Sequence, residues 1–85
     1  MDAIKDKIIE LIIKIKGNEP CYNISNSNLP LTGFTMQFDE IDLVYLLLEV
    51  MKTFNIKIKA EDVMNYRFNT IDQIAETVRK YSNEI

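Results

Sequence analysis

Few side chains in this chain of 85 residues have the chemistry that catalysis or metal binding requires. There is no histidine, so neither a serine–histidine pair nor an imidazole metal ligand can form. The carboxylates of Asp39, Glu40 and Asp42 lie close together, but they lack the alternating ligands and central glycine of a calcium loop. The sequence therefore predicts no catalytic residue, no metal site and no enzymatic activity.

The single cysteine, Cys21, follows Pro20 in a segment without regular hydrophobic spacing, and no basic neighbour in the sequence would activate its thiol. One cysteine also excludes an internal disulfide framework. The chain shows no secretory signal pattern, and from these features we expect a cytoplasmic protein.

The composition is typical of one compact helical domain, residues 1–85. Hydrophobic residues make up 47% of the chain and charged residues 27%, with only two glycines and two prolines, which argues against a disordered or fibrous chain. The lysines are scattered and the net charge is -3, so a nucleic-acid partner is not expected. No apolar run reaches the length of about eighteen residues that a membrane span requires.

Residues 3–16 should form the first helix. Asp2 is expected to cap the amides of the first turn, and Gly17 supplies a left-handed residue at the end. Lys14 and Lys16 suit the negative end of the helix dipole. Apolar residues at three- and four-residue spacing form one face. They are Ile4, Ile8, Leu11, Ile12 and Ile15.

Residues 18–38 are expected to form a long loop. Its asparagines suit turns, because asparagine tolerates left-handed backbone angles and bonds to its own backbone. Apolar side chains spaced along the loop are predicted to hold it against the core. They are Ile24, Leu29, Leu31 and Phe34.

The second helix should run from Glu40 to Thr53. Asp39 caps its first turn, and Asp42 three residues later completes a capping box. The helix contains more apolar residues than one face can bury, and they fall into two stripes. The core-facing stripe is Leu43, Leu46, Leu47, Val50 and Phe54. The second stripe is Ile41, Val44, Tyr45, Leu48 and Met51.

This second stripe has two interpretations. If it stays exposed, it is an apolar strip of the kind that marks a protein interface, with its members as the partner-binding residues. If the neighbouring helices wrap further around, both stripes are buried.

The C-terminal third should contain two more helices. Residues 55–59 are interpreted as a loop, and a short third helix is predicted over 60–66, with Val63, Met64 and Tyr66 facing inward. Asn69 or Thr70 then caps the last helix. Its inner face would carry Ile71, Ile74, Ala75 and Val78, and its solvated face Asp72, Glu76, Arg79 and Lys80.

Residues 39–44, Asp-Glu-Ile-Asp-Leu-Val, resemble the Asp-Ser-Leu-Asp-x-Val signature of acyl and peptidyl carrier proteins, with Glu40 in place of the serine. Residues 46–58 resemble the family's apolar helix ending in Glu-Phe-Gly-Ile-x-Ile. Residues 31–33, Leu-Thr-Gly, and 68–71, Phe-Asn-Thr-Ile, are similar to segments of acyl-carrier-related proteins in bacterial peptide-maturation systems. The resemblance implies an all-α, four-helix carrier-protein-like bundle with a long first loop and a short third helix.

In that family the serine carries phosphopantetheine, whose thiol holds the cargo. The Glu40 carboxylate cannot accept this arm, so the chain is expected to have no cofactor. The resemblance then implies a non-catalytic binding or scaffold protein that recruits partner enzymes of a peptide-maturation or related biosynthetic pathway. The alternative is a working acyl or peptidyl carrier, with the prosthetic group on another residue or with its natural serine replaced. Thr35, five residues before Glu40, is the nearest hydroxyl upstream.

The role of Glu40 has two interpretations as well. A carboxylate is a favourable first-turn residue at the positive end of a helix dipole. Its negative charge also resembles the phosphate of a loaded carrier. In the family, the outer side of this helix is the surface that partner enzymes recognise, which here corresponds to the second stripe. An exposed stripe can also pair with itself, so a homo-oligomer is possible.

Overall fold

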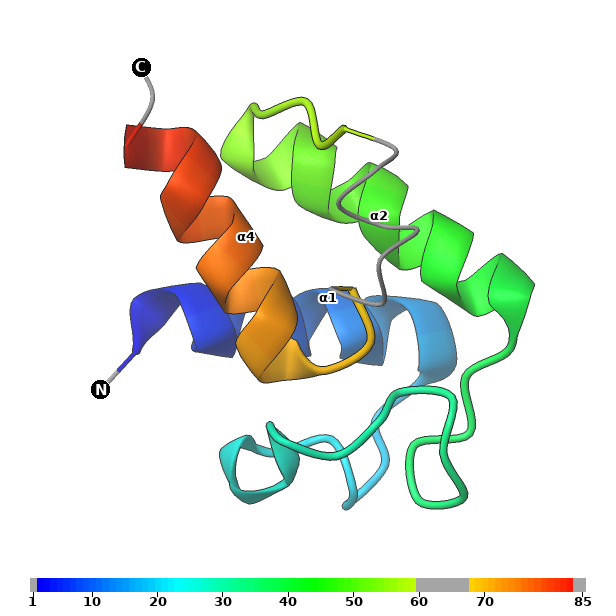
Figure 1. The fold of residues 1–85 in the computed structure, drawn as a ribbon. Coiled ribbons are helices and arrows are strands. Elements are labelled where there is room, and N and C mark those ends of the chain that lie inside the picture. The colour runs from blue at the N-terminus through cyan, green and yellow to red at the C-terminus, as the bar shows by residue number, and fades with distance from the viewer. Residues whose placement is uncertain (1, 60–67, 84–85) are drawn as a thin grey trace.

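The computed structural model describes residues 2–59 and 68–83 and is all-α (Figure 1). Within these ranges it contains three α-helices, one 3₁₀ helix and no strand. The elements are α1 (Ala3–Lys16), the 3₁₀ helix η1 (Ile24–Asn26), α2 (Glu40–Phe54) and α4 (Ile71–Asn83). The short third helix expected over 60–66 lies outside the described residues, as do its inward-facing side chains. The described part therefore has three α-helices, and it does not by itself make the expected four-helix bundle.

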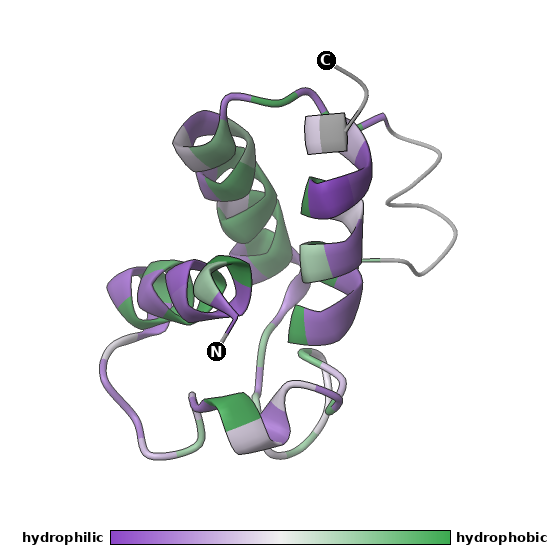
Figure 2. Cartoon of the chain, turned by 90° about the vertical axis from the view of Figure 1, so that its left-hand side faces the viewer, coloured by the Kyte–Doolittle hydropathy of each residue, from purple (hydrophilic) through white to green (hydrophobic). Residues whose placement is uncertain are grey.

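Helix α1 packs against both other helices. In Figure 1, α2 lies above α1, α4 crosses in front of α1, and the long loop between α1 and α2 lies below, where η1 also contacts α1. Figure 2 shows that α2 is hydrophobic around most of its surface, whereas the outer side of α4 is polar. The three helices thus enclose one core, and α2 has apolar surface in excess of what the core receives.

The core draws on all three helices and on the loop. The expected α1 stripe is confirmed, because Ile8 and Ile12 are fully buried and Leu11 is buried. Its end residues, Ile4 and Ile15, pack partly buried against the cluster. The α4 face is also confirmed, since all four of its predicted members are buried. They are Ile71, Ile74, Ala75 and Val78.

The helix ends follow from local side-chain chemistry. Asp2 accepts hydrogen bonds from the backbone N–H groups of Ile4 (3.1 Å) and Lys5 (3.3 Å), so it caps α1 as predicted. Gly17 ends α1 with φ 98° and ψ 166°, which is a positive φ but not the expected left-handed helical conformation. Thr70 caps α4, because its Oγ1 accepts from the N–H of Gln73 at 3.0 Å.

The loop is held to the core by side chains that differ in part from those predicted. Leu31 is fully buried and Leu29 is partly buried, as expected. The prediction was wrong for Ile24 and Phe34, which are 50% and 93% exposed. Phe34 follows Gly33 in a turn closed by a hydrogen bond from Gly33 N–H to a backbone carbonyl at 3.0 Å, which directs the chain outward there.

Three other loop residues enter the core instead: Tyr22, Met36 and Phe38. The Tyr22 hydroxyl donates to the backbone oxygen of Met36 at 3.3 Å, and the rings of Tyr22 and Phe38 meet edge to face with centroids 6.3 Å apart. Both ends of the loop are therefore packed together, which holds in place a long segment whose only regular element is the short helix η1.

The loop is also joined to the start of α4 by backbone hydrogen bonds. The N–H of Leu31 donates to the carbonyl of Asn69 at 2.7 Å, and the N–H of Asp72 donates to the carbonyl of Ser27 at 3.0 Å. The side-chain oxygen of Asn69 accepts from both the N–H and the hydroxyl of Thr32. The Leu-Thr-Gly and Phe-Asn-Thr-Ile segments, which are distant in the sequence, are thus hydrogen-bonded to each other.

Candidate protein-binding surface on α2

The outer face of α2 carries four exposed apolar side chains, which we call the α2 strip. The exposed fractions are 65% for Ile41, 54% for Val44, 57% for Tyr45 and 53% for Leu48. On the opposite face, Leu46 and Val50 are fully buried. The expectation that one stripe of α2 is core and the other partly exposed is therefore confirmed, and the interpretation in which both are buried is wrong.

Met51, the fifth residue predicted for this surface, is in a different environment. Its side chain is only partly exposed, and its sulfur accepts a hydrogen bond from the N–H of Ile58 at 3.4 Å. The segment after α2 folds back along the end of the helix to make this contact. Met51 therefore lies at the border of the α2 strip and contributes less open surface than the other four residues.

The N-terminus of α2 is closed by a capping box. The N–H of Asp42 donates to the Asp39 carboxylate at 2.8 Å, and the N–H of Asp39 donates to the Asp42 carboxylate at 3.1 Å. Glu40 is exposed, and its carboxylate has no hydrogen bond or ion pair within the described ranges. Of the three clustered carboxylates, two are thus used to start the helix, while the third faces solvent beside the α2 strip.

Lys16 connects the end of α1 to this helix start. Its ammonium group donates to the Asp42 carboxylate at 2.8 Å and to the backbone oxygen of Gln37 at 3.3 Å, and it lies 5.6 Å from the ring centre of Phe38. The hydrogen bond from Lys16 lowers the pKa of the Asp42 carboxyl, and the same bond raises the pKa of Lys16. Lys16 therefore acts by a specific ion pair rather than only through the α1 dipole.

The Lys16–Asp42 pair should make stability depend on pH, and Asp42→Asn should remove part of that dependence. Because the Asp42 pKa is lowered on folding, its contribution is complete above about pH 4, the unfolded value, and is lost as the pH falls through the folded value. Both side chains are at most one quarter exposed, so we expect a loss of about 1 kcal/mol at pH 7.

Urea unfolding at pH 7 and pH 3 would measure this effect. The difference between wild type and Asp42→Asn should shrink at the lower pH. Glu49→Gln is the matched control, since its partner Lys14 is 63% exposed and the pair should contribute little. If Asp42→Asn lost the same free energy of unfolding at pH 7 and pH 3, the result would contradict a pH-dependent contribution of the Lys16–Asp42 pair.

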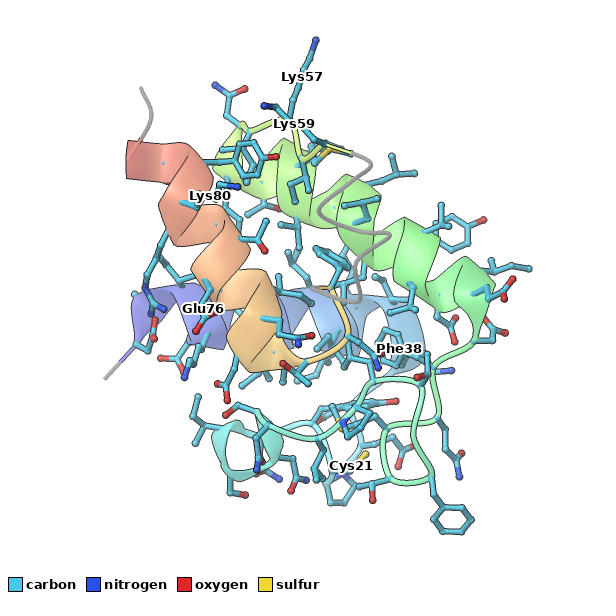
Figure 3. All side chains as sticks on the ribbon, in the orientation of Figure 1. Cys21, Phe38, Lys57, Lys59, Glu76 and Lys80 are labelled. Carbon is cyan, nitrogen blue, oxygen red and sulfur yellow. The ribbon has the colours of Figure 1, made fainter. Side chains whose placement is uncertain are left out.

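Two hollows lie near α1, and neither has the side chains of a reaction site. A groove of about 470 Å³ between α1 and α2 has mixed charge, and two of its lysines are already paired to Glu10 and Glu49. A second hollow, of about 530 Å³, is lined in part by Cys21 and Thr35. Figure 3 shows Cys21 in the loop, on the other side of α1 from α2. No group of three metal-ligating side chains occurs among the residues described.

Comparison with protein families, curated proteins and solved structures finds no match to this chain. None of the described helices has the length and hydropathy of a membrane span. Sequence reasoning missed two features, the exposure of Phe34 in the loop and the Lys16–Asp42 pair at the start of α2. The pair joins residues 26 positions apart, so no local spacing indicates it.

Proposed function

We propose that this protein is a non-catalytic binding module that recruits a protein partner through the α2 strip. The observation that carries the proposal is the exposure of four large apolar side chains on one helix face, each more than half open to solvent. Maintaining such a contiguous apolar patch in water is unfavourable, and patches of this kind commonly mark interaction sites. Tyr45 and Leu48 are the expected anchors, because aromatic and large aliphatic side chains contribute most when they fill a partner's pocket.

We further propose that the chain is a carrier-like protein without the prosthetic arm, built as a four-helix bundle. The support is the resemblance over residues 39–44 and 46–58, together with the long first loop that covers α1. On this proposal the partners are enzymes of a peptide-maturation or related biosynthetic pathway, and the module acts in the cytoplasm.

The partner surface can be tested by site-specific photo-crosslinking in an extract of the source cells. A photoreactive residue at Tyr45 should crosslink to a protein other than this chain, so the mass of the product should differ from twice the mass of the chain. The same probe at Glu76, which is exposed on the outer side of α4, is the control (Figure 3). Leu48→Asp in the Tyr45 probe should abolish the product. Equal labelling from both positions would contradict the proposal.

The second candidate is a working carrier with its prosthetic group on another residue or with its natural serine replaced by Glu40. The exposure of both residue 40 and the nearest upstream hydroxyl, Thr35, supports this candidate. Intact-mass measurement with coenzyme A and a broad-specificity phosphopantetheinyl transferase separates the two functions. We expect an unchanged mass for the wild type. A gain of one phosphopantetheine would contradict the arm-free proposal, and peptide mapping would then test Thr35, the exposed hydroxyl nearest before α2.

Glu40→Ser is the positive control for that measurement. Residue 40 is exposed and its side chain supports no neighbour in the described ranges, so the serine variant should fold as the wild type does. If the carrier resemblance is correct, this variant should gain the mass of one arm. If Glu40→Ser keeps the circular-dichroism spectrum of the wild type but gains no phosphopantetheine, the result would count against the carrier resemblance.

A further inference from the structure

We propose that, in the absence of its partner, the α2 strip is covered by the same strip of a second copy of this chain, with the two α2 helices antiparallel. The protein would then be a weak symmetric dimer. This dimer goes beyond the proposed function. One consequence of it, that a partner would compete with the second copy for the α2 strip, rests on the proposed function.

The first argument is the arrangement of residues along α2. Glu40, Val44, Leu48 and Lys52 are spaced four residues apart, so they form one continuous ridge of the helix surface. Both ends of the ridge are exposed charged residues, and both middle positions are exposed apolar residues. Ile41 and Tyr45 form the adjacent ridge. Ridges of this four-residue class are the ones that most often pack against their counterparts on another helix.

The second argument is charge complementarity. In a symmetric pair the same patch is used by both copies, so it must complement itself. An antiparallel pairing centred between Val44 and Leu48 places Glu40 of one copy beside Lys52 of the other, at both ends. A parallel pairing would place Glu40 beside Glu40 and would also align the helix dipoles unfavourably. The charge pattern therefore selects the antiparallel arrangement.

The other acidic groups next to the strip do not oppose this pairing. Asp42 is bonded to Lys16 at 2.8 Å, and Glu49 is bonded to Lys14 at 3.2 Å. Both carboxylates are thus neutralised within their own chain by α1. A second copy can approach without bringing unpaired carboxylates of the two chains together along this edge.

The size of the strip sets the strength of the dimer. The ridge spans twelve residue steps, or about 18 Å of helix. Such a face is smaller than the roughly 800 Å² per partner of a stable interface, so we expect a dissociation constant of about 100 µM. A dimer of this strength would be displaced by a partner that binds the α2 strip more tightly, and it would keep the apolar surface covered until then.

Sedimentation equilibrium between about 10 µM and 1 mM, which brackets the expected constant, tests the proposal. The wild-type mass should rise from 9.9 kDa toward twice that value. Leu48→Asp should remain monomeric. Glu40→Lys and Lys52→Glu should each weaken association about tenfold at low salt, because each places like charges at both ends of the pair. Circular dichroism checks that each variant is folded.

The decisive test combines the two charge reversals, either in two mixed chains or in one chain. An equimolar mixture of Glu40→Lys and Lys52→Glu chains should associate as the wild type does, and so should the double variant, because opposite charges again meet at each end. A wild-type mass that stays at 9.9 kDa to 1 mM would overturn the proposal. So would a dimer that is unaffected by either single charge reversal, since it would use another surface.

The outcomes also separate this inference from the proposed function. If the chain is monomeric but Tyr45 still crosslinks to a larger protein, the dimer is wrong and partner recruitment stands. If the Tyr45 probe gives only a product of twice the chain mass, the dimer stands and partner recruitment fails.

Discussion

Val50→Asp should lower the free energy of unfolding by about 4 kcal/mol or prevent folding, because a carboxyl group would be placed in an apolar core without a partner. Val50 is fully buried on the inner face of α2. A small domain has a total stability of about 5–15 kcal/mol, so this single change could remove most of it. Urea unfolding followed by circular dichroism would measure the loss.

Leu48→Asp is the matched control on the same helix. Leu48 lies two residues earlier and is 53% exposed, so the added carboxylate remains hydrated and the change should stay within about 0.5 kcal/mol. If both variants lost the same stability, the α2 strip would be part of the core, and both the binding proposal and the dimer would be wrong. A large difference leaves Leu48→Asp as a folded variant for the binding experiments.

Leu31→Ala should cost about 3 kcal/mol, because the side chain is fully buried and its removal leaves a cavity in a close-packed core. Leu31 also lies where the loop joins α4, since its N–H donates to the Asn69 carbonyl and its own carbonyl accepts from the N–H of Phe38. Loss of packing there should loosen the loop as well as the core. Thermal unfolding and amide hydrogen exchange of the loop residues would show both effects.

Phe34→Ala provides the comparison from the same loop. Phe34 is 93% exposed, so its truncation should change stability by no more than about 0.5 kcal/mol. A loss as large as that of Leu31→Ala would mean that Phe34 packs against the protein, contrary to its position in the structure.

The sequence alone predicted the three described α-helices well, because their formation depends on neighbouring residues. The apolar spacing of α1 and α4 identifies their buried faces, and Asp2, Asp39 and Thr70 cap their helices through bonds to residues two or three positions away. The sequence also showed that α2 carries two apolar stripes, and the second stripe indicated the candidate surface. These features can be predicted without knowing which distant segments of the chain contact one another.

The long loop shows where local reasoning fails. Ile24 and Phe34 have the same hydrophobic character as Leu31, yet they are exposed while Leu31 is buried. Which of these residues reaches the core depends on the path of the backbone, and that path is set by contacts to distant segments. The bonds from Leu31 and Thr32 to Asn69 connect positions 37 or 38 residues apart, and no spacing rule predicts such a contact.

The exposure of the α2 strip likewise depends on tertiary contacts. The sequence determined that α2 has more apolar residues than one face can bury and that its first turn is acidic. Only the tertiary structure decided that α1 packs against α2, that Leu46 and Val50 are buried in the core, and that Val44 and Leu48 stay open. The reason is physical: a helix's pattern of side chains is set by its own residues, but the exposure of each face is set by which other elements pack against it.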